Sequence, residues 1–87
     1  MHDTDEMCVL RVIAREQDGQ YGCGFGKLIK ARPQKPRTPN PELGRERASL
    51  AVDQLVRDGL ACITVFLGME MFHVTEKGQV VASHLQS

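Results

Sequence analysis

Apolar residues recur at helical spacing near the start of the chain. The stripe that they form consists of Met7, Leu10, Ile13 and Ala14. Asp3 and Glu6 have the spacing of a capping box, in which Asp3 acts as the N-cap and accepts hydrogen bonds from backbone N–H groups. Asp18-Gly19 interrupts the pattern. The sequence therefore predicts a first helix that buries this stripe and has Asp3 at its N-terminus.

Glycine and proline break up the next part of the chain. Residues 19–26 contain four glycines, so we expect no regular element there. A short helix is predicted from about Phe25, because apolar residues then recur at i, i+3 and i+4. Arg32-Pro33 should end it, since the residue before a proline disfavours helical backbone. Residues 33–41 hold all four prolines of the chain and predict an extended, semi-rigid loop.

A longer helix is predicted to follow the prolines. Asn40-Pro41-Glu42 supplies an N-cap, a proline for the first helical position and an acid for the positive end of the helix dipole. The helix should run to Asp58, after which Gly59 suits a left-handed residue and Leu60 the closing hydrophobic contact. Its predicted buried stripe is Ala48, Ala51, Val52 and Leu55.

A β-hairpin and a last helix complete the predicted order. The strands are expected at 61–67 and 70–75, with Gly68-Met69 as a tight turn that has glycine at its first central position. This register pairs Val65 with Phe72 and Ile63 with Val74 on one side, and Phe66 with Met71 and Thr64 with His73 on the other. In the last helix, which Thr75 would cap, the apolar residues are Val80, Val81 and Leu85.

Two motifs in the second half of the chain resemble those of a known superfamily. They are Leu-Val-Arg-Asp-Gly-Leu at 55–60 and Val-Thr-Glu-Lys-Gly at 74–78. Together with the order of helix, short helix, loop, long helix, hairpin and helix, they resemble winged helix-turn-helix domains of the broad MarR/PadR type. In those domains the third helix ends in L-x-x-x-G-L, a hairpin wing follows, and T-x-x-G opens a further helix. The resemblance covers residues 42–86 most closely and implies an α+β, mostly helical fold that binds DNA. The chain departs from the pattern in its proline loop of about eight residues, where a helix-turn-helix has a turn of 3–4 residues.

Length and composition narrow the classes of protein that fit. The chain of 87 residues is expected to form a single domain over 1–87, and its net charge of zero excludes a global polycation. The longest uncharged apolar run, 60–67, is too short to span a bilayer, so we expect no membrane partner. The acidic N-terminus is unlike a signal peptide, and three widely spaced cysteines do not suggest a disulfide framework. A reducing cytoplasm is the predicted compartment.

The residues that could carry chemistry do not form a known catalytic or cofactor motif. Residues 22–27, Gly-Cys-Gly-Phe-Gly-Lys, have lysine where the dinucleotide fingerprint needs its third glycine, and Leu28 where a phosphate loop needs serine or threonine. No pair of cysteines or histidines has the short spacing of a metal site. We therefore expect no enzyme, no cofactor, no metal and no catalytic residue, and interpret the glycines as a turn between helices.

Charge is distributed unevenly along the chain. Residues 27–47 contain seven cations and two acids, a net charge of +5 in a chain whose total is zero. The winged-helix resemblance implies that this segment approaches the phosphate backbone, where lysine and arginine gain affinity by releasing counterions. A solvated loop without a specific partner is the alternative. The residues predicted to bind nucleic acid are Lys27, Lys30, Arg32, Lys35, Arg37, Arg45, Arg47 and Ser49.

Two features favour a protein partner instead. The outward face of the long helix presents Leu50 between Glu46 and Asp53, whereas helices that read bases usually present Arg, Lys, Asn, Gln or Ser. The predicted hairpin contains no lysine or arginine, and its apolar side chains suit adaptable protein contacts. The alternative is that a helix of the same chain covers the hairpin. The residues predicted to form a protein interface are Leu50, Phe66, Met69 and Met71.

The sequence therefore supports two hypotheses. In the first, the protein is a DNA-binding transcriptional regulator, and it is a homodimer because one small module buries little DNA. In the second, it is an accessory or inhibitor protein that uses the same scaffold to bind a protein with an acidic or apolar surface. Double-stranded DNA is the partner expected first, and no small-molecule inducer is expected.

Overall fold

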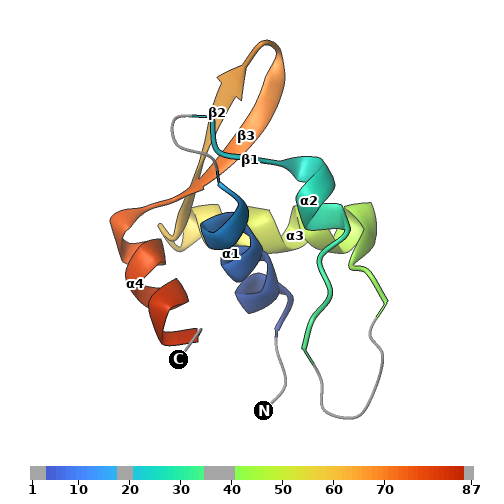
Figure 1. Cartoon of the computed structure of the whole chain (residues 1–87), viewed down its shortest axis with the longest axis vertical. Coiled ribbons are helices and arrows are strands. Elements are labelled where there is room, and N and C mark those ends of the chain that lie inside the picture. The colour runs from blue at the N-terminus through green and yellow to red at the C-terminus, as the bar shows by residue number, and fades with distance from the viewer. Residues whose placement is uncertain (1–3, 18–20, 35–40, 86–87) are drawn as a thin grey trace.

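Four helices and a three-stranded antiparallel sheet make up the part of the chain that the computed structural model describes, residues 4–17, 21–34 and 41–85. The helices are α1 (Asp5–Glu16), α2 (Phe25–Ile29), α3 (Gly44–Arg57) and α4 (Glu76–Leu85). The strands are β1 (Cys23–Gly24), β2 (Ala61–Phe66) and β3 (Met69–Val74), in the order β1-β3-β2. The hairpin of β2 and β3 extends away from the helices along the 40 Å dimension of the molecule (Figure 1). The predicted α+β, mostly helical fold class is confirmed.

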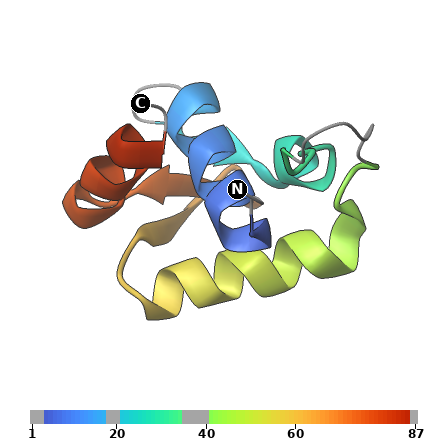
Figure 2. The ribbon, with the colours of Figure 1, turned by 90° about the horizontal axis from the view of Figure 1, so that it is seen from below.

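Helix α1 lies at the centre of the helical layer. Seen from below, α4 and α2 flank it and α3 runs across its lower side (Figure 2), and α1 also contacts β3. The stripe predicted for α1 was therefore too narrow, because neighbours cover several of its faces. Met7 of that stripe is 40% exposed. The residues of α1 that are buried are Cys8, Val9, Leu10, Val12 and Ile13.

The N-termini of α1 and α3 differ from their predictions. Thr4 is the N-cap of α1, and its side chain accepts a hydrogen bond from the N–H of Met7 at 3.1 Å. The capping prediction was therefore wrong by one residue, and Asp3 lies outside the described residues. Helix α3 begins at Gly44 rather than after Asn40. Asn40, the predicted N-cap, also lies outside the described residues. Gly44 has a left-handed φ of 82°, so right-handed helix cannot extend backwards through it.

The C-terminus of α3 has the predicted form. Gly59 has a φ of 75°, its N–H donates to the carbonyl of Val56, and the N–H of Leu60 donates to the carbonyl of Leu55. This pair of hydrogen bonds is a Schellman motif, which satisfies carbonyls that the end of the helix leaves open. The helix itself ends at Arg57, one residue before the predicted end.

Strand β1 was missed by the sequence analysis, which expected no regular element in residues 19–26. Cys23 pairs with Phe72 and Gly24 pairs with Met71. A two-residue strand has no periodicity of its own, and this one exists because β3 offers it a partner. Gly22, just before β1, has a φ of 81°, and a Cβ there would collide with His73 and the carbonyl of Phe72. Gly22 therefore lets the backbone approach β3 closely, and this contact explains the glycine without a phosphate loop.

The hairpin confirms the predicted faces of the sheet but not the predicted pairs. The turn is Leu67-Gly68, with φ values of 50° and 79°, instead of Gly68-Met69. Positive φ at both central residues is typical of a type I′ turn, which matches the twist of a hairpin. Each partner is therefore displaced by two residues, so every side chain keeps its predicted face. The observed pairs include Ile63 with Phe72, Thr64 with Met71, Val65 with Glu70 and Phe66 with Met69.

The two motifs of the sequence meet where α4 begins. The N–H of Thr75 donates to the carbonyl of Leu60, and its hydroxyl donates to the carbonyl of Gly59. The same hydroxyl accepts from the N–H of Gly78, which confirms the predicted cap of the last helix. Gly78 packs so closely that a Cβ would overlap the carbonyl of Leu60. The start of α4 is thus fixed to the end of α3.

Candidate functional site

The cations predicted to bind nucleic acid lie in two places. Lys27, Lys30 and Arg32 are exposed on and just after α2, whereas Arg45 and Arg47 are exposed on α3 together with Ser49. Lys35 and Arg37 lie outside the described residues. The structure therefore divides the predicted site between two helices, and each group has its own neighbours.

A pocket of about 380 Å³ lies where α1 faces α2 and the residues that follow α2. Three of the cations predicted to bind nucleic acid line it, namely Lys27, Lys30 and Arg32. Cys8 and Val12 also line it. Two further cations come from α1, Arg11 and Arg15. We call this the basic pocket and define it by Arg11, Arg15, Lys27, Lys30 and Arg32.

The two α1 cations were missed by the sequence analysis, although a signal was present. Arg11 and Arg15 are four residues apart, so they share one face of the helix, away from the predicted apolar stripe. What the sequence could not provide is that this face lies beside α2. Charge counted along the chain finds only the cations of one segment, whereas the pocket combines two segments.

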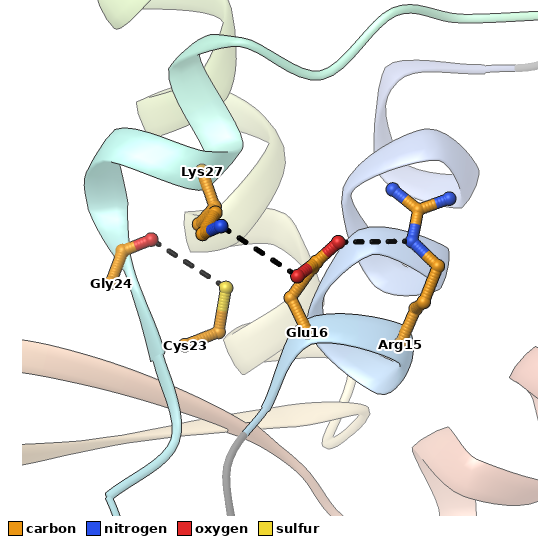
Figure 3. Close-up of polar contacts among 5 residues, drawn as sticks. All are labelled: Arg15, Glu16, Cys23, Gly24 and Lys27. Atoms are coloured by element: carbon orange, nitrogen blue, oxygen red, sulfur yellow. Dashed lines mark hydrogen bonds and ion pairs between the residues drawn. The ribbon is translucent and has the colours of Figure 1, made fainter.

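One carboxylate, Glu16, lines the basic pocket and is shared by two of its cations. One oxygen lies 3.2 Å from Nε of Arg15, and the other lies 3.7 Å from Nζ of Lys27 (Figure 3). Exposed ion pairs of this kind contribute little to stability, about 0–1 kcal/mol each. Arg32 is also paired, with Glu42 outside the lining, at 3.5 Å from its Nη2. These two carboxylates balance only part of the positive charge, because five cations line the pocket.

Burial affects two groups in or beside this lining. It lowers the pKa of the Arg11 guanidinium from its ordinary value, and the nearby charge of Arg15 lowers it further. Burial also raises the pKa of the Cys8 thiol to about 11, with a smaller contribution from the charge of Asp5. Cys8 is therefore an uncharged thiol at neutral pH and does not offset the positive charge.

The cations on α3 are in a different situation. Arg47 forms a two-bond contact with the carboxylate of Asp5 on α1, at 2.9 Å from Nε and 2.7 Å from Nη2. Such a two-bond pair fixes the guanidinium to the body of the protein. Among the described residues, Arg45 forms no ion pair and points from the first turn of α3 into solvent. Of the two α3 cations predicted to bind nucleic acid, Arg45 is thus more available to a ligand than Arg47.

The outward face of α3 has the residues that the sequence predicts. Leu50 is 63% exposed, and Glu46, Asp53 and Arg57 are exposed on the same helix. Carboxylates on both sides of an exposed leucine repel a phosphate backbone. They suit a partner surface that has an apolar centre and basic residues around it.

The hairpin exposes more apolar surface than the sequence analysis predicted. Phe66 and Met69 are exposed as predicted, and Met71 is half-buried. Leu67 at the turn is 84% exposed and Val65 is 71% exposed, and neither was predicted. The alternative that a helix covers the hairpin is wrong for the described part of the chain, where the ring that Phe66 meets is Tyr21, centred 4.8 Å away. We define the apolar hairpin surface by exposed residues on both faces of the hairpin and at its turn, namely Ile63, Val65, Phe66, Leu67 and Met69.

A groove of about 610 Å³ lies between this hairpin, the start of α2 and α3. Its apolar walls include Phe25, Val52 and Ile63. Its charged lining residues are Asp53 and Glu70, and no lysine or arginine in residues 4–17, 21–34 and 41–85 lines it. The groove is therefore apolar with an acidic character, the opposite of the basic pocket.

Two other kinds of site receive no support from the described residues. No group of three or more histidine, cysteine, aspartate or glutamate side chains within them could hold a metal ion. Nor does any helix in these ranges have the length and apolar character to cross a membrane. His73 on β3 contacts the hydroxyl of Thr64 at 3.0 Å, within the sheet.

Comparison with known proteins identifies no relative. No protein-family model matches the chain, and neither a curated protein nor a solved structure matches it. The function must therefore be argued from the two surfaces themselves.

Proposed function

We propose that this protein is an interaction module that binds an extended segment of a partner protein along its hairpin and the adjoining groove. The observation that carries the proposal is Leu67, an 84% exposed leucine with a left-handed φ of 50°. That turn position favours asparagine, aspartate or glycine. A leucine there costs backbone energy and gains no burial within the monomer, and such strain is typical of positions that serve function.

Strand β2 supports the same proposal. It lies at the edge of the sheet, and five of its six residues are exposed. The strand, Ala-Cys-Ile-Thr-Val-Phe, contains none of the charges or prolines that normally protect an edge against pairing. An added strand could therefore use the open backbone groups of β2, as in other cases of β-augmentation.

The charges around the groove define the chemistry of the partner segment. Asp53 and Glu70 line the groove, and no cation of the described part of the chain lines it. A segment with alternating apolar residues and one or two lysines or arginines would match both the apolar hairpin surface and these carboxylates. This proposal keeps the apolar character of the partner predicted from the sequence but replaces its acidic charge by a basic one, because the charged lining residues are carboxylates.

The experiment uses two exposed valines as a matched pair. Short random peptides displayed on phage are selected on the immobilised protein, and the peptides obtained are titrated into the wild type, Val65→Lys and Val80→Lys. Val65 is 71% exposed on β2, and Val80 is 59% exposed on α4. We expect apolar peptides with basic residues, whose affinity falls at least about tenfold in Val65→Lys, a loss equivalent to about 1.4 kcal/mol, and stays unchanged in Val80→Lys.

Two results would contradict the proposal. One is that no peptide shows binding that depends on Val65. The other is a molar mass by light scattering that doubles in the wild type and returns to the monomer in Val65→Lys. In that case the occupant of β2 is a second copy of the chain, as in a homodimer.

Duplex DNA is a second candidate, which rests on Arg45 and Ser49. Both are exposed in the first half of α3, the helix that would enter the major groove if the scaffold is a winged helix-turn-helix. The hairpin after α3 and the Thr75–Gly78 start of α4 support that scaffold.

Fluorescence anisotropy with random-sequence duplex at two salt concentrations tests this candidate. Arg45→Ala should weaken binding and reduce its dependence on salt, whereas Arg57→Ala, at the other end of α3, should change neither. Equal binding by both variants would remove α3 as the contact.

A further inference from the structure

We propose that the basic pocket binds a small anion that carries two or more phosphate groups. The proposal concerns a different surface from the hairpin and is independent of the partner proposed above. It begins from the convergence of cations. Arg11 and Arg15 come from α1, Lys27 comes from α2, and Lys30 and Arg32 come from the residues just after α2.

The positive charge of the pocket exceeds what its own carboxylate can balance. Among the described residues that line the pocket, Glu16 is the one acid, and Arg15 and Lys27 already contact it (Figure 3). Glu42, which does not line the pocket, pairs with Arg32. The lining therefore carries five positive charges and one negative charge. Like charges four residues apart on a helix, such as Arg11 and Arg15, destabilise it, and an anion between them would remove that repulsion.

The shape of the pocket favours a compact anion over a long one. Its volume of about 380 Å³ lies within the range of sites for small molecules. Guanidinium groups form paired hydrogen bonds with phosphate oxygens, and lysine ammonium groups add point charges. Three arginines and two lysines thus offer contacts for more than one phosphate group.

The pocket also indicates what it would not recognise. Among the residues that the structure describes, no aromatic ring lines it, so none of them can stack on a nucleobase. Its uncharged lining consists of Cys8, Val12, Ala31 and Gln34. Recognition would therefore depend on the number and spacing of phosphate groups, and inorganic diphosphate and triphosphate are the appropriate probes.

Calorimetric titration at low salt tests the proposal on the full chain. We expect triphosphate to bind more tightly than diphosphate, and diphosphate more tightly than orthophosphate. Arg15→Gln and Lys30→Gln should each weaken triphosphate binding roughly tenfold, the loss expected when one charged hydrogen-bond donor is removed. Arg57→Gln, an exposed arginine at the end of α3, should leave it unchanged.

A further variant tests whether Glu16 competes with the ligand for its cations. Glu16→Gln removes the carboxylate that competes with the ligand for Arg15 and Lys27, so triphosphate affinity should rise severalfold. Thermal melting of every variant checks that the helices still pack. Each loss of affinity is interpreted only against a melting temperature equal to that of the wild type.

Three outcomes would overturn the proposal. The first is no measurable triphosphate binding by the folded wild type. The second is binding that Arg15→Gln and Lys30→Gln leave as it was. The third is displacement of triphosphate by random-sequence duplex that binds more tightly and loses affinity in the same variants, because the surface would then belong to nucleic acid.

Discussion

The basic pocket and the apolar hairpin surface are built in opposite ways. The pocket lies between α1 and α2, beside the packed core that includes Cys8, Val9 and Leu28. The hairpin extends from the helical layer, and its exposed residues have little protein around them (Figure 1). One region is concave and charged, whereas the other protrudes and is apolar.

The difference reflects the range of the forces that each region would use. Attraction between charges acts over about 8 Å at physiological salt, so cations can stand in a solvated recess and still attract a ligand. Apolar attraction requires that surfaces touch and exclude water. Apolar groups that bind a partner must therefore be open to direct contact, as the exposed residues of the hairpin are.

The largest expected effect concerns the contact between the start of α4 and Leu60. In Gly78→Ala, the new methyl group overlaps the backbone carbonyl of Leu60, so α4 must move away from the end of α3. We expect a loss of about 2–3 kcal/mol of unfolding free energy, the upper range for overpacking. Chemical denaturation measures it, with Gly26→Ala as the control, because nothing lies within 4 Å of a Cβ at that helical glycine.

Gly26→Ala should be neutral or stabilise the protein by about 0.5–1 kcal/mol. Equal stability of the two variants would mean that α4 can move away from Leu60 at little cost in unfolding free energy. That result would contradict the close packing of Gly78 on Leu60.

Cysteine chemistry should separate the two regions clearly. Cys62 on β2 is exposed, whereas burial raises the pKa of both Cys8 and Cys23 to about 11. The two buried thiols should therefore have about a hundredfold less thiolate than an ordinary cysteine near neutral pH. Mass spectrometry after brief alkylation should find the label on Cys62 first. Rapid labelling of Cys8 would show that the wall of the pocket opens readily.

The same shifts predict a direction for stability at high pH. In the unfolded chain the thiols lose their protons near 9.0, while the folded protein retains them to about 11. The folded state thus binds more protons in this window. The contribution of Cys8 and Cys23 to stability is complete below the unfolded value and declines as the pH rises from 9.0 towards 11. Denaturation of Cys8→Ala across that window should show a shallower decline than the wild type.

A smaller effect is expected at the turn of the hairpin. Leu67→Asn should raise the unfolding free energy by about 1 kcal/mol, because asparagine tolerates the left-handed conformation that leucine disfavours. The same change should weaken binding of the peptides proposed above. Leu50→Asn is the control, since Leu50 is 63% exposed on ordinary helix and should lose a few tenths of a kcal/mol. A Leu67→Asn variant that is less stable than the wild type would contradict the assignment of strain.

The smallest expected effect on the unfolding free energy distinguishes Arg47, which is paired with Asp5, from Arg45, which forms no ion pair among the described residues. Arg47→Ala should cost less than about 1 kcal/mol, because its pair with Asp5 is half-exposed. Arg45→Ala should cost nothing measurable. High salt should reduce the difference between the two variants, and a difference that survives it would point to packing rather than charge.

Features set by neighbouring residues could be predicted from the sequence. The Schellman motif at Gly59-Leu60 and the cap at Thr75 depend on a few adjacent positions, and both were confirmed. The two faces of the hairpin followed from its alternation. Its pairing did not, because the turn placed leucine rather than glycine at the first left-handed position.

Features that depend on distant contacts could not be predicted. The pairing of Cys23 with Phe72 and the approach of Arg11 and Arg15 to α2 require the packed fold. The role of Arg47 was misjudged for the same reason, since its partner Asp5 is 42 residues away. The predicted nucleic-acid site therefore grouped cations by their position in the sequence, whereas the described ones are exposed on two separate helices.

Strand β2 also has a consequence for how the protein behaves at high concentration. Its open edge of six uncharged, mostly exposed residues has the composition of segments that stack into fibrils. A partner that covers this edge would act as a solubilising cap as well as a ligand. We expect the isolated chain to aggregate as its concentration rises, and the bound chain to tolerate storage better. The partner's abundance would then limit how much of this protein a cell can safely hold.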